Sequence, residues 1–146
     1  MRRLLLVATS LVLVSMVLGP GRVFAHHSFA AEYIVQQKVI LKGTISKMVW
    51  VNPHGWLYID ASEIDGKPVE GGKAQPWALE FGSPVRLLQA GIRRTDLPVG
   101  SIVTVEAYRA KNGSNTANAS RVILANGQAL FAGSSAESAG QKLPVN

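Results

Sequence analysis

Three histidines are the side chains in this sequence best suited to metal chemistry. His26 and His27 are adjacent, and His54 lies in a second short motif, W-V-N-P-H-G-W at residues 50–56. Imidazole nitrogens suit Cu(II), which stands at the top of the affinity series for divalent first-row metals. If His26 became the first residue of the chain, its α-amine and its imidazole could chelate one ion together. The pattern therefore predicts a copper site made of His26, His27 and His54.

The alternative is that these histidines are structural or incidental. No H-x-H or H-E-x-x-H spacing fixes the geometry of a site, and no cysteine supplies a thiolate. In an extended segment the side chains of His26 and His27 point to opposite sides, so both need not reach one ion. His54 would then be a surface hydrogen bonder in its loop. Zn(II) and Ni(II) would accept the same nitrogen ligands as Cu(II).

The first 25 residues determine whether His26 becomes a chain terminus. A basic start, an apolar run over residues 4–18 and small residues before a cut after Ala25 form the layout of a secretory signal peptide. An uncleaved membrane anchor is disfavoured, because a span needs roughly 20 apolar residues and this run ends earlier, at Gly-Pro-Gly. We expect residues 1–25 to be removed and the mature chain to be periplasmic or secreted, without stable membrane insertion.

The mature chain would be a single domain of modest charge. Cleavage after Ala25 leaves 121 residues, enough for one hydrophobic core without disulfides. Arg2, Arg3 and Arg22 leave with the signal peptide, so the net charge of +6 falls to +3. A nucleic-acid-binding surface normally shows a denser basic stripe than these scattered residues form. We therefore expect an unknown small ligand or a periplasmic protein as the partner, and no nucleic acid.

The elements that must position these side chains are mostly strands. Alternating apolar and polar residues predict them, and Lys47 interrupts the first one, where we expect a twist or a bulge. Ser83-Pro84 is a typical cap and first residue of a helix. The expected strands cover residues 39–51, 55–61, 77–81, 101–109, 118–124 and 128–131, and the expected helix covers residues 85–90.

Three strands, a short helix and further strands give the element order of an OB-fold. The sequence therefore predicts an all-β domain with one short helix, a small five-stranded OB-like barrel over residues 38–133. Another small β-barrel or meander is the alternative. Residues 26–37 are expected to form an N-terminal arm, and the Ser-, Ala- and Gly-containing residues 134–146 a disordered tail.

A group of aromatic residues offers a second kind of site. Trp56 and Tyr58 fall on the strand face opposite Leu57 and Ile59, and Trp77 belongs to the next strand. Because OB-folds bind ligands on the outer face of strands two and three, Trp56, Tyr58 and Trp77 are candidate ligand-binding residues. The alternative is that the N-terminal arm folds back over them as a second small core, which would also bring its two histidines toward the third.

No constellation indicates catalysis. The acidic residues between positions 60 and 65 lie near a turn, and Ser83 has no neighbouring histidine. Gly71-Gly72-Lys73 lacks the spacing of a phosphate-binding loop. We therefore predict a protein that is not an enzyme and has no catalytic residue. A copper-dependent oxidase is disfavoured, because 121 residues leave little room for a broad substrate platform.

Five motifs resemble an uncharacterised bacterial family of small exported proteins, catalogued as a domain of unknown function. They are H-H-S-F-A-A-E-Y at 26–33, L-K-G-T-I at 41–45, W-V-N-P-H-G-W at 50–56, W-A-L-E-F-G-S-P at 77–84 and Y-R-A-K-N-G-S-N-T-A-N-A at 108–119. The resemblance implies a signal peptide and one exported β domain, and it implies no known activity.

The predicted function is that of a periplasmic, non-enzymatic binding domain that holds copper through its mature N-terminal histidine and a loop histidine. The alternative is a metal-free ligand- or protein-binding module of OB type that uses the aromatic face.

Overall fold

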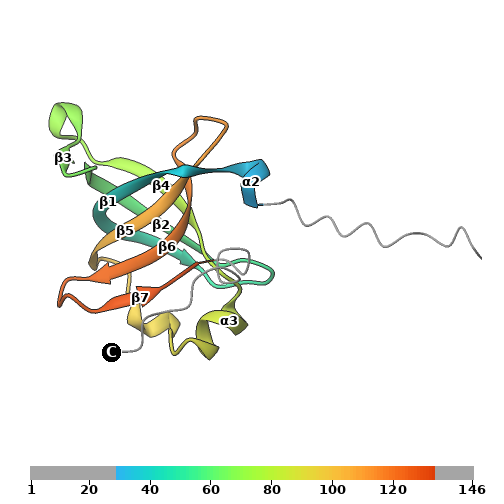
Figure 1. Ribbon diagram of the computed structural model, residues 1–146. Helices are drawn as coiled ribbons and strands as arrows, with labels where there is room; N and C mark the ends of the chain where they lie inside the picture. Colours follow the sequence, from blue (N-terminus) through green and yellow to red (C-terminus); the bar gives the residue numbers. More distant parts are fainter. Residues whose placement is uncertain (1–28, 134–146) are drawn as a thin grey trace, which may run out of the picture.

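The first strand is the longest element and shapes the whole sheet. The computed structural model describes residues 29–133, and in it β1 runs from Tyr33 to Val49 (Figure 1). Its first part pairs with β5 and its second part with β2, both in antiparallel fashion. The other elements are α2 (Phe29–Glu32), β2 (Trp56–Ile64), β3 (Lys67–Pro68), η1 (Glu70–Gly72), β4 (Gln75–Glu80), α3 (Pro84–Gln89), η2 (Arg94–Asp96), β5 (Ile102–Ala110), β6 (Thr116–Leu124) and β7 (Ala129–Phe131).

Five of the strands pair in a closed ring, in the order β1, β2, β4, β6, β5 and back to β1. The β4–β6 contact is parallel and the other four are antiparallel. The predicted all-β class is confirmed. The ring order and the helix α3 between β4 and β5 also fit the predicted OB-like arrangement.

Two irregularities bend β1, which pairs with both β2 and β5. The register with β2 shifts between Lys42 and Gly43 and again between Ile45 and Lys47. At Gly43 the backbones come so close that a Cβ atom would lie 2.3 Å from the carbonyl oxygen of Asp60. The bulge expected at Lys47 is present, and it places Met48 instead of Val49 on the buried side. These bends match the role of bulges and glycines where a strand turns a corner.

The interior of the ring is filled by the apolar face of each strand, as the alternation predicts. Leu57 and Ile59 of β2 are fully buried. The short helix α3 closes one end (Figure 1), and the side-chain oxygen of Ser83 accepts a hydrogen bond from the Arg86 backbone N–H, which confirms Ser83 as its cap. The core also includes Val39, Leu41, Ile45, Leu79, Phe81, Leu87, Val103, Val105 and Val122.

The end of the expected N-terminal arm is part of the sheet. β1 already begins at Tyr33, and α2 precedes it directly. Phe29 and Tyr33 pack against Tyr108, with ring centroids 5.3 Å apart for Phe29–Tyr33 and 5.4 Å apart for Phe29–Tyr108. A second small cluster of arm residues exists, but it packs on β5 and not on Trp56 and Tyr58, which stay partly exposed.

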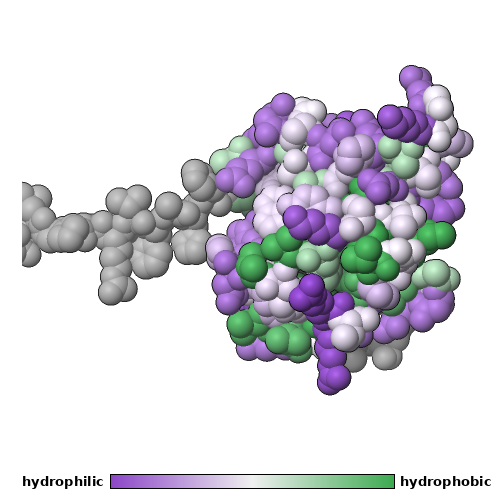
Figure 2. All heavy atoms as spheres, turned by 180° about the vertical axis from the view of Figure 1, so that it is seen from behind, coloured by the Kyte–Doolittle hydropathy of each residue, from purple (hydrophilic) through white to green (hydrophobic). Residues whose placement is uncertain are grey.

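The surface carries scattered apolar side chains. Figure 2 shows that polar and charged residues separate them on the face turned away from the viewer in Figure 1. Within residues 29–133, no helix is both long enough and apolar enough to cross a membrane. The expected signal peptide at residues 1–25 and the expected tail at residues 134–146 lie outside the described residues.

Candidate functional site

A buried carboxylate, Glu80 at the end of β4, is the centre of the candidate site. Only 6% of this residue is exposed. Three donors converge on its side chain: the Tyr33 hydroxyl and the Asn118 amide on Oε2, the latter at 3.3 Å, and Nδ1 of His54 on Oε1. A carboxylate removed from water needs such partners, because an unpaired buried charge is strongly unfavourable. Each oxygen of Glu80 thus contacts at least one neighbouring side chain.

The register of the sheet explains why these residues meet. Glu80 stands opposite Trp56 on one side and opposite Asn118 on the other, and Asn118 stands opposite Tyr108. These four residues form one row across β2, β4, β6 and β5. Because neighbours along a strand alternate faces, the row lies on the outside of the ring while Leu79 points inward. Tyr33, at the start of β1, covers the row and makes Glu80 a buried residue.

His54 reaches Glu80 from the loop between β1 and β2. The adjacent Gly55 is held to the end of β4 by two backbone hydrogen bonds, from its own N–H to the Gly82 carbonyl at 3.2 Å and from the Phe81 N–H to its carbonyl at 2.8 Å. The loop is therefore fixed beside Glu80. The His54 side chain is 45% exposed, so one edge of the ring faces the carboxylate while the ring as a whole remains accessible.

The contact between Nδ1 of His54 and Glu80 favours one arrangement of the ring protons. An ionised carboxylate only accepts hydrogen bonds, so Nδ1 of His54 carries the proton. In the neutral imidazole the other nitrogen, Nε2, then presents its lone pair. Within the described part of the chain, Nε2 has no hydrogen-bond partner. His54 is thus an oriented and accessible side chain with a nitrogen that could bind a ligand.

The Tyr33 hydroxyl is held in its protonated form. Burial raises its pKa well above the ordinary value, and the hydrogen bond to Glu80 and the negative charges of Glu80 and Glu32 act in the same direction. Tyr33 therefore remains a hydrogen-bond donor throughout the physiological pH range.

Of the three histidines predicted as metal ligands, the structure places His54. His26 and His27 lie outside the described residues. Among residues 29–133, no three His, Cys, Asp or Glu side chains cluster closely enough to hold a metal ion by themselves. Any metal at His54 would therefore need ligands from elsewhere.

The three aromatic residues predicted as a ligand-binding face do not share one face. Trp56 and Tyr58 are partly exposed on the outside of the ring, as expected. Trp77 is only 2% exposed and belongs to the core inside the ring, where the Arg109 guanidinium lies 5.0 Å from the centre of its indole. The alternation in β4, which puts Trp77 on the side of Leu79, is the signal that indicates its burial.

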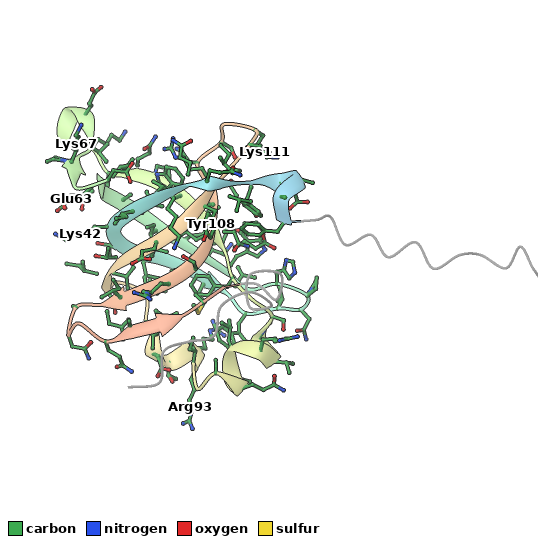
Figure 3. The ribbon with its side chains drawn as sticks, viewed as in Figure 1. Lys42, Glu63, Lys67, Arg93, Tyr108 and Lys111 are labelled. Atoms are coloured by element: carbon green, nitrogen blue, oxygen red, sulfur yellow. The ribbon has the colours of Figure 1, made fainter. Side chains whose placement is uncertain are left out.

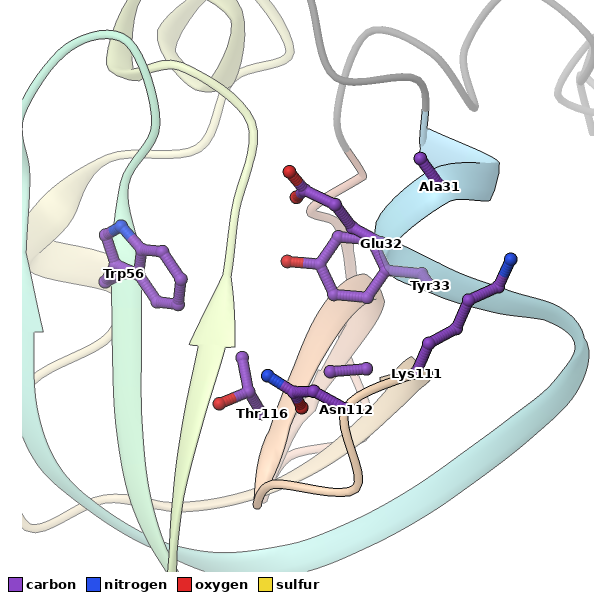
Figure 4. Close-up of a pocket in the computed structure, with 8 residues that line it drawn as sticks. Ala31, Glu32, Tyr33, Trp56, Lys111, Asn112 and Thr116 are labelled. Carbon is purple, nitrogen blue, oxygen red and sulfur yellow. The ribbon is translucent and has the colours of Figure 1, made fainter.

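A cavity of about 470 Å³ opens beside Glu80, between α2 and the start of β2. Figure 4 shows Trp56 on one side of it and Tyr33 and Glu32 on the other. Lys111, Asn112 and Thr116 contribute from β6 and the loop before it. The ammonium group of Lys111 donates to the carbonyl of Ala30 and so ties this loop to α2. Figure 3 shows Lys111 on the same side of the molecule as α2, far from the Lys42–Glu63 pair.

Glu80, Tyr33 and Asn118 are site residues that the sequence patterns do not indicate. These residues are far apart in the sequence. Tyr33 and Glu80 are separated by 47 positions, and Asn118 and Glu80 are separated by 38 positions. For Glu80, the sequence pattern near it is the alternation of β4. This alternation places Glu80 on the same face as Ala78, opposite Leu79. Nothing near Glu80 in the sequence indicates that this outer face is covered.

The comparisons with known proteins identify a family and no activity. A model described as a family of unknown function (DUF6152) matches residues 13–119. This match agrees with the expected uncharacterised domain. Neither the curated proteins nor the solved structures gave a match.

Proposed function

The chain belongs to this family of unknown function, and on that premise we propose that it is an exported copper-binding domain. In this proposal Nε2 of His54 is one ligand of Cu(II). The α-amine and imidazole of His26, exposed by cleavage after Ala25, chelate the same ion, and His27 is a further nitrogen available from the same segment. The role is binding, without catalysis.

The observation that supports the proposal most strongly is the contact between His54 and buried Glu80. Metal-binding histidines almost always donate their second ring N–H to a carboxylate or carbonyl, which fixes the tautomer and raises the basicity of the ligating nitrogen. In this proposal the Glu80 carboxylate is that second partner of His54. Both oxygens of Glu80 already contact neighbouring side chains, so in this proposal Glu80 orients His54 and Nε2 of His54 binds the ion.

The anchoring of α2 makes a contribution from His26 sterically reasonable. Phe29 packs on Tyr33, and the Tyr33 hydroxyl shares the Glu80 carboxylate with His54. His26 precedes Phe29 by three residues, which span at most about 11 Å when fully extended. The covalent chain therefore keeps His26 in the neighbourhood of the cluster that contains His54. An amine and imidazoles are nitrogen ligands that favour Cu(II).

The test is a Cu(II) affinity measurement on the mature protein beginning at His26, by competition with a chelator of known affinity. We expect His54→Ala, or acetylation of the terminus, to lower the affinity at least tenfold. Glu80→Gln should lower it about 10- to 100-fold, as is typical for loss of a second partner of a ligating histidine.

The matched control is Glu63→Gln. Glu63 pairs with Lys42 at the other end of β2, with Nζ and Oε1 2.8 Å apart, and its replacement should leave the copper affinity unchanged. The proposal is wrong if the mature protein binds Cu(II) no more tightly than a peptide of residues 26–33, or if His54→Ala binds as tightly as the unmodified protein.

A further inference from the structure

The cavity between α2 and Trp56 contains groups that the copper proposal does not use. Its volume of about 470 Å³ falls in the range of small-molecule sites. One wall is the partly exposed indole of Trp56 on β2. The opposite wall is α2 with Tyr33, and Thr116 of β6 and Asn112 of the loop before it complete the lining.

The polar groups of the lining favour a ligand that both donates and accepts hydrogen bonds. Glu32 offers a carboxylate acceptor and Thr116 a hydroxyl. The oxygen of the Asn112 side chain already accepts from the backbone N–H and the hydroxyl of Ser114, so its NH₂ group is the part that can donate to a ligand. Carboxylate, amide and hydroxyl beside an aromatic face together complement a ring that carries several hydroxyl groups.

The charges in the cavity favour an uncharged ligand. The lining holds one group of each sign, Glu32 and Lys111. Figure 4 shows the ammonium of Lys111 directed away from Trp56, and it is bound to the Ala30 carbonyl. An anion would be repelled by the Glu32 carboxylate, and a cation would be repelled by the Lys111 ammonium. A simple ammonium ion would leave the amide and hydroxyl donors unused.

We propose that this cavity binds a neutral pyranose ring, a sugar or a sugar unit of a longer glycan, stacked on Trp56 and hydrogen-bonded to Thr116, Asn112 and Glu32. The proposal does not depend on copper. Apolar C–H groups on one face of such a ring pack on the indole, while its hydroxyl groups meet the polar side of the cavity.

The experiment is ligand binding to chelator-treated mature protein, followed by tryptophan fluorescence and by ¹⁵N-correlated NMR. The probes are methyl glycosides of common hexoses, their tri- and tetrasaccharides, choline chloride and sodium acetate. We expect a glycoside to bind and to shift the Trp56 indole N–H signal. Tighter binding of the oligosaccharides would assign the site to a glycan, and equal binding would assign it to a free sugar.

Trp56→Ala should weaken binding at least tenfold, and Thr116→Val about fivefold, the effect of one lost hydrogen bond. Tyr58→Ala is the matched control, since Tyr58 is a partly exposed aromatic residue on the same strand face but does not line the cavity. The affinity of Tyr58→Ala for the glycoside should stay within twofold of that of the unmodified protein. The proposal is overturned if no glycoside binds, if choline or acetate binds instead, or if the shifted signals lie away from Trp56. None of these outcomes affects the measured affinity for Cu(II). Either proposal can therefore be wrong while the other holds.

Discussion

At the scale of single residues, Glu80 links separate parts of the chain at the site. Burying a carboxylate is unfavourable unless hydrogen bonds replace its water, and removing one partner leaves much of that unfavourable desolvation uncompensated. Glu80 obtains its partners from three separate parts of the chain, Tyr33, His54 and Asn118. The carboxylate therefore fixes the position of His54 relative to the start of β1.

Replacing Tyr33 by phenylalanine tests this arrangement. Tyr33→Phe keeps the ring packed against Phe29 and removes only the hydroxyl, so Glu80 loses one donor inside the protein. We expect the free energy of unfolding, measured by urea denaturation, to fall by about 1–3 kcal/mol. Tyr58→Phe, at a partly exposed position, should change it by less than about 0.5 kcal/mol. Equal effects of the two substitutions would contradict the role assigned to the Tyr33 hydroxyl.

The raised pKa of Tyr33 gives a second expectation, at alkaline pH. The folded protein keeps the phenolic proton at pH values where the unfolded chain, with a pKa near 10, loses it. The contribution of the Tyr33 hydroxyl to the free energy of unfolding is therefore fully present below about pH 10 and declines as the pH rises above that value. The difference in unfolding free energy between the unmodified protein and Tyr33→Phe should shrink between about pH 10 and pH 11.5. A difference that stays constant or grows over this range would contradict the assignment.

At the scale of elements, α2 begins three residues after His26 and leads directly into β1. Phe29 connects them to β5 through its ring contacts with Tyr33 and Tyr108. We expect Phe29→Ala to lower the free energy of unfolding by about 1–3 kcal/mol, since aromatic pairs contribute beyond their buried area. It should also weaken Cu(II) binding several-fold, because the segment carrying His26 loses its anchor.

Val35→Ala is the control for the anchoring argument. Val35 lies on the same strand but is 45% exposed, so its truncation should leave the copper affinity unchanged. Urea denaturation and chelator competition on both variants separate the two effects. If Phe29→Ala loses stability but keeps its full copper affinity, α2 has no part in presenting the N-terminal histidine.

At the scale of the whole molecule, a closed ring with one main core should unfold as a single cooperative unit. Cu(II) bound only to the folded state would then stabilise the entire domain, by about 2.7 kcal/mol at a free concentration one hundred times the dissociation constant. We expect a rise in Tm with Cu(II) that disappears in His54→Ala. Mg²⁺, which prefers oxygen ligands, should give no rise. A Cu(II) effect that persists unchanged in His54→Ala would place the metal elsewhere.

The ring could be predicted from the sequence because its strands are specified by local patterns. Alternation indicated the buried face of β2, Lys47 the bulge in β1, and Ser83 the start of α3, and all three are present. The site could be predicted only in part. His54 is conspicuous by residue type, but Glu80 acquires its role from partners that the closing of the sheet brings together. Trp77, predicted with Trp56 and Tyr58 as a ligand-binding residue, lies in the core because the alternation of β4 places it on the side of Leu79.

Coordination of Cu(II) by His54 can be tested directly by electron spin echo envelope modulation of the Cu(II)-loaded mature protein, which detects the non-coordinated ring nitrogen of each bound imidazole. Coordination by His26 and His54 should give modulation from at least two imidazoles, one of which disappears in His54→Ala. In Glu80→Gln that contribution should remain with an altered quadrupole coupling, because the Nδ1–H of His54 loses its carboxylate partner. Modulation that is identical in the unmodified protein, His54→Ala and Glu80→Gln would contradict the central claim that His54, oriented by Glu80, binds the metal through Nε2.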